Sequence, residues 1–235
     1  MAELLFRDDA YLRSCEATVV AADERGVQLD RTVFYPTGGG QPGDSGVLVV
    51  ADGSRIKVGE ARKVDGADGV LHVLAQGAVA PVIGAKVVAE IDWERRHRLM
   101  RMHTCLHLLS AVLRYPVTGG QVGDGKGRLD FDIAEASLDK DAITERLNAL
   151  IAEDHAVLPR WISDAELLGS PELVKTMSVK PPMGAGRVRL VEVAGLDLQA
   201  CGGTHVTRTG EIGRVIVRKI ESKGRQNRRV NLEFA

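Results

Sequence analysis

Two short segments of the sequence carry side chains that suit a metal ion. The first is HTCLH at residues 103–107, in which His103 and His107 stand four residues apart. Residues four apart on a helix share a face, so both imidazoles can reach one ion, whereas Cys105 points roughly opposite and is excluded as a ligand. Alone, such a pair is more typical of two buried histidines on an amphipathic helix. The glutamate of an HExxH protease is absent, so that mechanism is not available in its usual form.

The second segment is CGGTH at residues 201–205. Its two glycines would permit a tight turn that brings the thiolate of Cys201 and the imidazole of His205 together. Alone, this pattern equally describes a glycine-rich turn with a bystander cysteine. Together, three histidines and one cysteine form a complete tetrahedral ligand set for Zn²⁺. We therefore predict one Zn²⁺ per chain, held by His103, His107, Cys201 and His205. The remaining histidines, His72, His97 and His155, lack a partner pattern and are interpreted as structural or surface residues.

A third segment, YPTGGGQPGD at residues 35–44, is unusually rich in glycine. Gly38, Gly40 and Gly43 satisfy the spacing of a dinucleotide-binding fingerprint. That fingerprint must open a helix, but Pro42 and a strand-like run at residues 47–50 follow here, so the dinucleotide interpretation fails. The simplest alternative is a loop that connects two strands.

The elements that must position these groups fall into two regions. Residues 1–92 contain short apolar runs separated by Gly, Asp and Pro, which is typical of a small barrel or sandwich. These runs lie at residues 17–22, 27–34, 47–50, 69–74 and 86–91. Asp92 is a plausible N-cap for a long helix to about Arg114, stopped by Pro116.

Further along the chain, periodic apolar residues predict a second helix from about Leu138 to Ala156, ended by Pro159. Strand-like segments follow at residues 187–193, 214–221 and 228–234, and the last two indicate a hairpin. The predicted class is α+β. A small β-barrel-like domain (residues 1–92) precedes a mixed domain (residues 93–235) in which an antiparallel sheet and long helices carry the zinc site.

Composition restricts the setting. The 235 residues are 44% hydrophobic and 27% charged, which is ordinary for a globular protein. No apolar run approaches the roughly 18 residues of a membrane helix, and the first residues lack the pattern of a secretory signal. Three widely spaced cysteines do not form a disulfide framework, so a reducing, cytoplasmic location is expected. No pattern indicates an ATP site or an oligomeric state.

The net charge of −1 conceals a basic end, because residues 208–235 hold 8 basic and 3 acidic side chains. Such an end suits contact with a polyanion, although a solvated surface explains it equally well.

The motifs occur together in one known family. HTCLH, then DLQACGGTHV about a hundred residues later, with FYPTGGGQPGD near the front and IESKGRQNRRV near the end, resembles the editing domain of alanyl-tRNA synthetases. No residues remain for an aminoacylation domain, so the chain is similar to the free-standing alanyl-tRNA editing proteins of the AlaX type, in their medium-length form. The resemblance implies a zinc-dependent hydrolase that deacylates mischarged tRNA(Ala), above all Ser-tRNA(Ala) and also Gly-tRNA(Ala).

The resemblance also implies roles for other residues. It places the glycine-rich loop beside the metal, where the Thr37 hydroxyl and the Gln41 amide would line the pocket. Apart from the resemblance, the excess of 8 basic over 3 acidic residues at the basic end and its place in the expected hairpin favour tRNA contact through Lys223, Arg225, Arg228 and Arg229. Four arginines that open the long helix could extend this basic face, namely Arg95, Arg96, Arg98 and Arg101. The competing hypothesis is a zinc-stabilised tRNA-binding module without catalysis.

Overall fold

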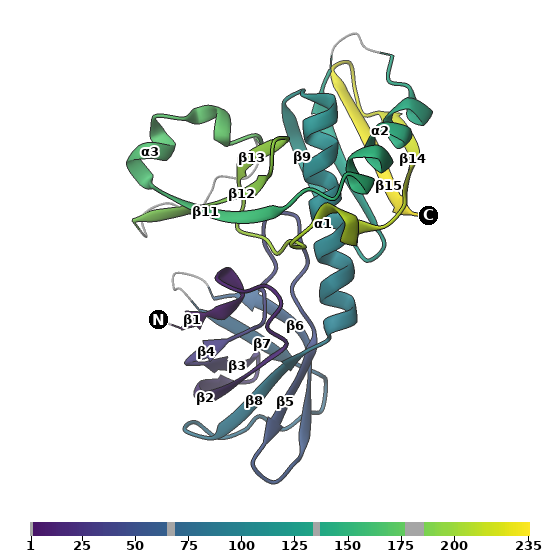
Figure 1. The fold of residues 1–235 in the computed structure, drawn as a ribbon. Helices are drawn as coiled ribbons and strands as arrows, with labels where there is room; N and C mark the ends of the chain where they lie inside the picture. Colours follow the sequence, from purple (N-terminus) through teal and green to yellow (C-terminus); the bar gives the residue numbers. More distant parts are fainter. Residues whose placement is uncertain (1, 65–68, 134–136, 177–185) are drawn as a thin grey trace. The chain divides into compact units, whose positions relative to one another are not determined.

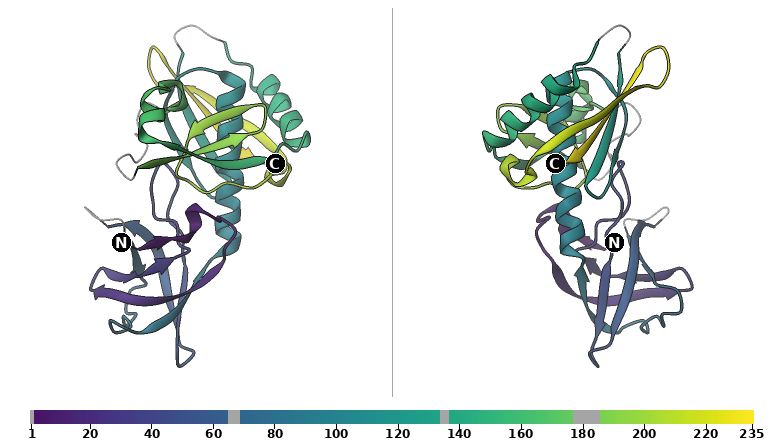
Figure 2. Two further views of the ribbon diagram at one scale, coloured as in Figure 1. Left: turned by 60° about the vertical axis from the view of Figure 1, so that its left-hand side comes forward. Right: turned by 90° about the vertical axis from the view of Figure 1, so that its right-hand side faces the viewer.

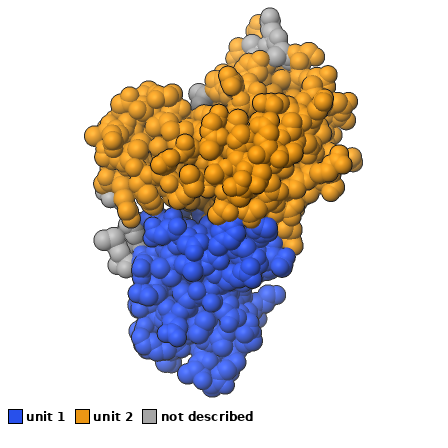
Figure 3. Space-filling model, viewed as in Figure 1, with its two compact units in different colours: residues 1–97 blue, residues 98–235 orange. Residues whose placement is uncertain are grey.

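The computed structural model describes residues 2–64, 69–133, 137–176 and 186–235, and this part of the chain is mostly β-structure with three α-helices (Figure 1). The chain forms two compact units, Met1–His97 and Arg98–Ala235, which Figure 3 colours separately.

The first unit is built around a closed barrel of six antiparallel strands, in the order β2-β3-β7-β6-β5-β8. The strands are β2 (Ser14–Asp23), β3 (Gly26–Leu29), β5 (Gly46–Val50), β6 (Arg55–Lys63), β7 (Val70–Leu74) and β8 (Lys86–Ile91). Outside the barrel, β1 (Glu3–Leu4) pairs in parallel with β4 (Arg31–Thr32), and a short 3₁₀ turn, η1, covers Leu5–Arg7. Alternating side chains such as Val19, Leu29 and Leu48 fill the interior. The expected barrel is confirmed, although β6 was not predicted from the sequence.

His72 belongs to this barrel core. Its Nε2 lies 2.8 Å from the Thr32 hydroxyl and its Nδ1 lies 3.1 Å from the Val27 carbonyl oxygen. Burial lowers the pKa of His72 to about 4, so the ring is neutral at ordinary pH. The structural interpretation of this histidine is therefore correct.

The second unit contains most of the long helix α1 (Trp93–Leu113) and a four-stranded antiparallel sheet in the order β14-β15-β10-β9. Its strands are β9 (Val117–Val122), β10 (Lys126–Asp132), β14 (Val215–Ser222) and β15 (Asn227–Phe234). The predicted hairpin is β14–β15, drawn in yellow in Figure 2. Helix α2 (Lys140–Ala152) binds the sheet edge, because the Asn148 amide donates to the Val215 carbonyl and accepts from the Val215 N–H.

Helix α1 begins where the sequence predicts. The Asp92 side chain accepts a hydrogen bond from the Arg95 backbone N–H at 3.1 Å, as an N-cap should. From Met102 to Ser110 every residue of α1 is buried, so this stretch is enclosed on all sides rather than on one stripe. The histidines at 103 and 107 consequently lie in the interior of the unit.

A separate three-stranded antiparallel sheet, β11-β12-β13, completes the second unit. Its elements are β11 (Val157–Ser163), β12 (Arg187–Val193) and β13 (Asp197–Ala200), accompanied by helix α3 (Asp164–Leu168) and the 3₁₀ turns η2 (Pro171–Leu173) and η3 (Thr209–Ile212). Two expectations are corrected here. Helix α2 begins after an Asp139 N-cap and ends at Ala152, and Pro159 lies inside edge strand β11, where no inner neighbour requires its missing N–H.

Among the residues that the structure describes, no helix is both long and apolar enough to cross a lipid bilayer.

Candidate metal centre

Four side chains from two distant segments meet inside the second unit. His103 and His107 lie one turn apart on α1, and Cys201 and His205 lie on the segment that follows β13. One ligand atom from each lies within 4.8 Å of those of the other three. The Sγ of Cys201 is 3.3 Å from Nε2 of His205 and 3.6 Å from Nε2 of His103. The structure thus brings together all four residues predicted from the sequence as metal ligands.

The spacing of these atoms fits a tetrahedral ion. Zinc–sulfur and zinc–nitrogen bonds of about 2.3 and 2.0–2.1 Å place a sulfur and a nitrogen ligand roughly 3.6 Å apart at a tetrahedral angle. Both measured Sγ···Nε2 separations are close to this value. The three histidines are at most 7% exposed, so few waters compete for them. Three imidazoles and a thiolate are donors that suit zinc. The cluster can therefore hold a metal ion.

The electrostatics of the cluster favour the ligand forms of Cys201 and His205. Burial raises the pKa of the Cys201 thiol, but the neighbouring imidazoles of His103 and His205 outweigh it and hold that pKa well below its ordinary value. Burial, with His103 nearby, also lowers the pKa of His205 well below its ordinary value. A thiolate and a neutral imidazole are the states that bind a cation.

Cys105 does not belong to the cluster. It is fully buried on another side of α1, and burial raises the pKa of its thiol to about 12. Cys105 therefore packs in the core, on a side of the helix that the cluster does not use.

Behind the ligands, a buried carboxylate faces one imidazole. Oδ2 of Asp197 lies 3.5 Å from Nδ1 of His107, a ring atom that has no hydrogen-bond partner among the described residues. Lys175 forms an ion pair with Oδ1 of Asp197, and the Gln199 amide donates to Oδ2 at 2.6 Å. Burial raises the pKa of Asp197, yet His107 and Lys175 lower it to about 2. Burial lowers the pKa of His107, but Asp197 and Cys201 raise it to about 9.

Sequence reasoning missed this carboxylate. Asp197 stands four residues before Cys201 in the motif DLQACGGTHV, but no spacing rule connects it to a histidine on a helix 90 residues earlier. A carboxylate that faces the far nitrogen of a ligating histidine is a recurrent feature of metal sites, because it fixes the orientation of the ring. Similarly, the Thr104 hydroxyl lies 3.1 Å from Nδ1 of His205.

The turn between Cys201 and His205 is held by Arg189. Its guanidinium donates to the carbonyl oxygens of Cys201 at 3.1 Å and Gly203 at 2.9 Å, and the Gly203 N–H donates to the Cys201 sulfur at 3.4 Å. Neither glycine of the turn has a positive φ, and a Cβ built at the exposed Gly202 meets open space. The glycines are therefore not required by strain within the turn.

The glycine-rich loop lies in the first unit, and its predicted polar groups have local partners there. The Thr37 hydroxyl donates to Glu60 at 2.8 Å and accepts from the Gly43 N–H at 2.7 Å. Gln41 is almost fully buried. A Cβ at Gly43 would lie 1.9 Å from the Ala61 carbonyl oxygen, so only glycine fits at that position. The roles of Thr37 and Gln41 in a pocket stay predictions.

The basic end of the chain lies on the hairpin β14–β15 and its turn. Lys223 and Arg225 are exposed at the turn, and Lys223 pairs with Glu221 at 3.3 Å. Arg228 donates to the Ser222 hydroxyl and the Gly224 carbonyl, which fastens the turn. Arg229 forms a two-point ion pair with Asp130 on the neighbouring strand. Their tRNA-binding role stays a prediction.

The idea that four helix arginines extend a basic face is wrong for Arg96. This side chain is fully buried in the first unit, where it pairs with Asp44 and donates to the backbone carbonyls of Ala10 and Val33. Arg98 is paired with Asp124. Arg101 donates to the Ile212 carbonyl, and its guanidinium carbon lies 4.2 Å from the centroid of the Phe234 ring. These partners come from distant segments that the helix sequence does not reveal.

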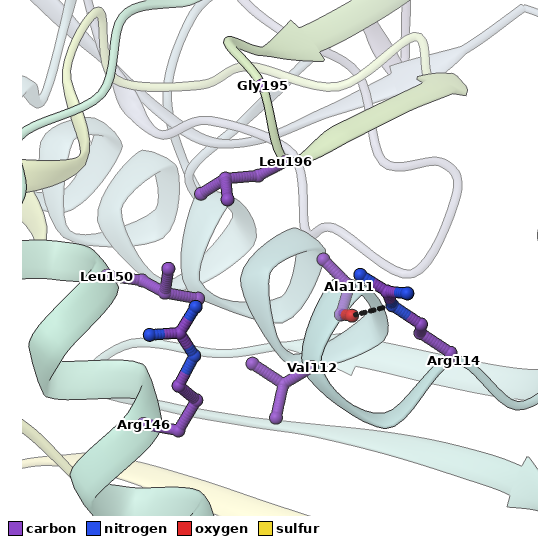
Figure 4. Close-up of a pocket in the computed structure, with 7 residues that line it drawn as sticks. All are labelled: Ala111, Val112, Arg114, Arg146, Leu150, Gly195 and Leu196. Atoms are coloured by element: carbon purple, nitrogen blue, oxygen red, sulfur yellow. Dashed lines mark hydrogen bonds between the residues drawn. The ribbon is translucent and has the colours of Figure 1, made fainter.

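A shallow pocket of about 220 Å³ lies past the His107 turn of α1 (Figure 4). It is lined by Ala111, Val112, Arg114, Arg146, Leu150, Gly195 and Leu196. Its lining includes none of the four cluster residues, and the Arg114 guanidinium donates to the Ala111 carbonyl at 3.3 Å. The pocket is therefore separate from the metal centre.

Comparison with known proteins gives information that is independent of the geometry. Residues 188–231 match the threonyl and alanyl tRNA synthetase second additional domain, and residues 9–95 match the class II (A) tRNA synthetases. The chain is 38% identical to the alanyl-tRNA editing protein AlaX-M of Methanosarcina mazei, over 98% of the chain and 95% of that protein. Identity to the AlaX-M protein of Saccharolobus solfataricus is 35%, over 98% of both chains. The alanine–tRNA ligase of Saccharolobus islandicus is 33% identical over 93% of the chain, which spans 25% of the ligase.

Both matching family models derive from aminoacyl-tRNA synthetases, which defines a synthetase-related protein. The relatives that match over almost their entire length form a narrower class, because each is named as an alanyl-tRNA editing protein. The chain belongs to the family of alanyl-tRNA editing proteins of the AlaX-M type.

Proposed function

We propose that this protein is a trans-editing hydrolase that deacylates mischarged tRNA(Ala), chiefly Ser-tRNA(Ala) and also Gly-tRNA(Ala), at a zinc site. The observation that carries the proposal is the similarity along the full length to proteins named for alanyl-tRNA editing. The buried His and Cys cluster supports it, because it offers a place for the chemistry that ester hydrolysis requires. A cytoplasmic location is part of the same proposal.

The four proposed ligands would hold the ion through three imidazoles and one thiolate. A bound Zn²⁺ supplies positive charge that polarises an ester carbonyl or makes water more acidic. The residues around it orient the ligands, with Asp197 facing His107 and Thr104 facing His205. Four protein ligands resemble a closed structural site, so a bound ion would act on the ester by accepting a fifth group or by releasing Cys201, or it would only position the substrate.

Hydrolysis of aminoacyl-tRNA with three different amino acids tests the function directly. We expect seryl-tRNA and glycyl-tRNA to be deacylated well above the spontaneous rate, and alanyl-tRNA to be spared. A protein that binds tRNA tightly but deacylates none of the three would instead be the zinc-stabilised binding module. Removing the metal further separates the enzyme from the binding module. If the metal is catalytic, the metal-free protein loses hydrolysis while it is still folded, whereas loss of a structural metal lowers only its stability.

Selectivity for serine over alanine cannot rest on size, because a pocket that admits serine also admits alanine. It must depend on the serine hydroxyl, since a buried polar group that is left unpaired penalises the smaller substrate. Thr37 suits this role in the proposal. Its hydroxyl donates one bond to Glu60 on β6 and accepts one from the Gly43 N–H of the loop, which leaves one lone pair for a substrate hydroxyl.

Replacing Thr37 with valine should reduce the difference in activation free energy between seryl-tRNA and alanyl-tRNA hydrolysis by about 1–3 kcal/mol, the cost of one lost hydrogen bond. The ratio of the two kcat/KM values measures it. Because valine also removes the bonds to Glu60 and Gly43, Thr37→Ser is the matched control, and it should retain the wild-type ratio. An unchanged ratio in Thr37→Val would show that this residue does not distinguish the substrates.

Within the hairpin turn, we expect the exposed Lys223 and Arg225 to contact tRNA more than Arg228 and Arg229, which already bond to neighbouring groups. The double variant Lys223→Gln/Arg225→Gln should weaken tRNA binding and flatten the log–log salt dependence by about 0.7–0.9 per lost phosphate contact. Arg229→Gln is the comparison, because Arg229 is less exposed and is already paired with Asp130, which it shares with Arg128. Wild-type affinity and an unchanged salt slope in the double variant would remove the turn from the tRNA-binding surface.

A further inference from the structure

The three-stranded sheet places a tryptophan and two arginines in register with the metal cluster. Trp161 on β11 pairs with Arg189 on β12, and the Arg189 carbonyl accepts a hydrogen bond from the Cys201 N–H at 3.1 Å. Residues paired across antiparallel strands point to the same face of a sheet. Trp161, Arg189 and Cys201 therefore form one row across the sheet.

This row lies on the face that serves the cluster. Side chains two residues apart on a strand share a face, so Asp197 and Gln199 of β13 lie on the same face as Cys201. Asp197 faces His107 on α1, and Arg189 holds the carbonyl oxygens of Cys201 and Gly203. Strands are about 4.8 Å apart, so Trp161 lies roughly 10 Å from Cys201 along the row.

Trp161 has the companion that a nucleic-acid site requires. The guanidinium carbon of Arg187 lies 4.3 Å from the centroid of the Trp161 ring. The tryptophan is half-buried and the arginine is exposed, so part of the pair is accessible to solvent. Bases stack on aromatic rings and on guanidinium planes, and an arginine also pairs with phosphate. Next to Cys201, the exposed Gly202 has no side chain, and a Cβ built there meets open space.

We propose that Trp161 and Arg187 form a platform that binds the 3′-terminal nucleotides of the aminoacylated tRNA and so positions the ester at the metal centre. The proposal rests on the proposed editing function. The ligand class is single-stranded RNA, because a tRNA presents its amino acid at an unpaired end. A base stacks on the pair and its phosphate meets the guanidinium of Arg187, while the ester extends past Arg189 toward Cys201.

The test uses the full-length protein and the fluorescence of Trp161. The chain has two tryptophans, Trp93 and Trp161, so Trp93→Phe leaves Trp161 as the reporter. A short single-stranded RNA that ends in a 3′-adenosine should quench this fluorescence. In the wild-type background, Trp161→Leu should weaken RNA binding at least about fivefold, the lower range for loss of one stacked base, whereas Trp161→Phe should retain most of it.

The matched control for Arg187 is Arg160, which stands next to Trp161 on β11. Arg187→Gln should flatten the salt dependence of RNA binding by about 0.7 in the log–log slope, as expected for one contact to a single strand. Arg160→Gln removes the same charge from the opposite face of β11, where Arg160 pairs with Glu192, and should leave the slope unchanged. Hydrolysis of a minimal aminoacyl ester without nucleotides should be equal in all variants, while KM for aminoacyl-tRNA should rise about fivefold or more in Trp161→Leu.

The outcomes separate this proposal from the function on which it rests. If the wild type hydrolyses no aminoacyl-tRNA but Trp161→Leu still loses RNA binding, the platform stands and the editing function fails. If editing proceeds while RNA leaves the fluorescence unchanged and Trp161→Leu keeps the wild-type KM, the platform is overturned. A lower melting temperature of Trp161→Leu with unchanged RNA affinity assigns the tryptophan to the stability of the sheet and likewise overturns the proposal.

Discussion

The double variant His103→Ala/His107→Ala will contain less than a tenth of the zinc of the wild type and will lose aminoacyl-tRNA hydrolysis. Two of the four proposed ligands are removed, and Cys201 and His205 alone do not form a tetrahedral site. Losing several kcal/mol of transition-state stabilisation corresponds to a rate lower by about 10²-fold or more. Elemental analysis measures the metal, and single-turnover deacylation of seryl-tRNA measures the rate.

A control variant and a stability measurement complete this experiment. His155→Ala removes a histidine of the same unit that pairs with Glu153 outside the cluster, and it should keep full zinc and full activity. Melting curves establish that the double variant is folded at the assay temperature. Full metal content in the double variant would contradict the assignment of the ligands.

Asp197→Asn should lower zinc affinity by about 10- to 100-fold, the usual effect of losing a group that orients a ligating histidine. Asparagine preserves the shape of the side chain but removes the negative charge that faces Nδ1 of His107 at 3.5 Å. Competition against a chromophoric chelator at constant pH measures the affinity. The ligand atoms themselves are unchanged, so the effect reports orientation and charge alone.

The ion pair between Asp197 and Lys175 requires a separate control. Lys175→Gln breaks the same ion pair while the carboxylate remains beside His107. The Lys175 side chain is partly exposed, so its replacement should disturb the fold little. We expect the affinity of Lys175→Gln to lie much closer to the wild type than that of Asp197→Asn. Equal zinc affinities of Asp197→Asn and the wild type would show that the carboxylate has no part in holding the metal.

The cluster of three histidines and one cysteine was predictable because its pattern is local and its chemistry is complementary. Helical spacing places His103 and His107 on one face, and a cysteine with a histidine four residues later supplies the two missing donors. The start of α1 was equally local, since Asp92 caps it as expected. The strands of residues 187–193 and the hairpin near the end also follow from short apolar runs bounded by turns.

Other features depend on partners that are distant in the sequence. Strand β11 contains Pro159, which local rules associate with the end of a helix, and only its place at a sheet edge makes the proline acceptable. Asp197 resembles any strand residue until the fold brings it to His107. The arginines near the end appeared free in the sequence, yet Arg229 is paired with Asp130 across the sheet.

The separation of the two ligand pairs along the chain has a consequence for folding. Cys201 lies 98 residues from His103, so an ion bound to both closes a ring of about a hundred residues. A covalent link across a ring of that size reduces the entropy of the unfolded chain by up to about 4–5 kcal/mol at 25 °C. A bound ion would thus act as a removable cross-link, and we expect the apoprotein to melt earlier even if the metal is catalytic. Loss of hydrolysis after chelation is therefore diagnostic only below the melting temperature of the apoprotein.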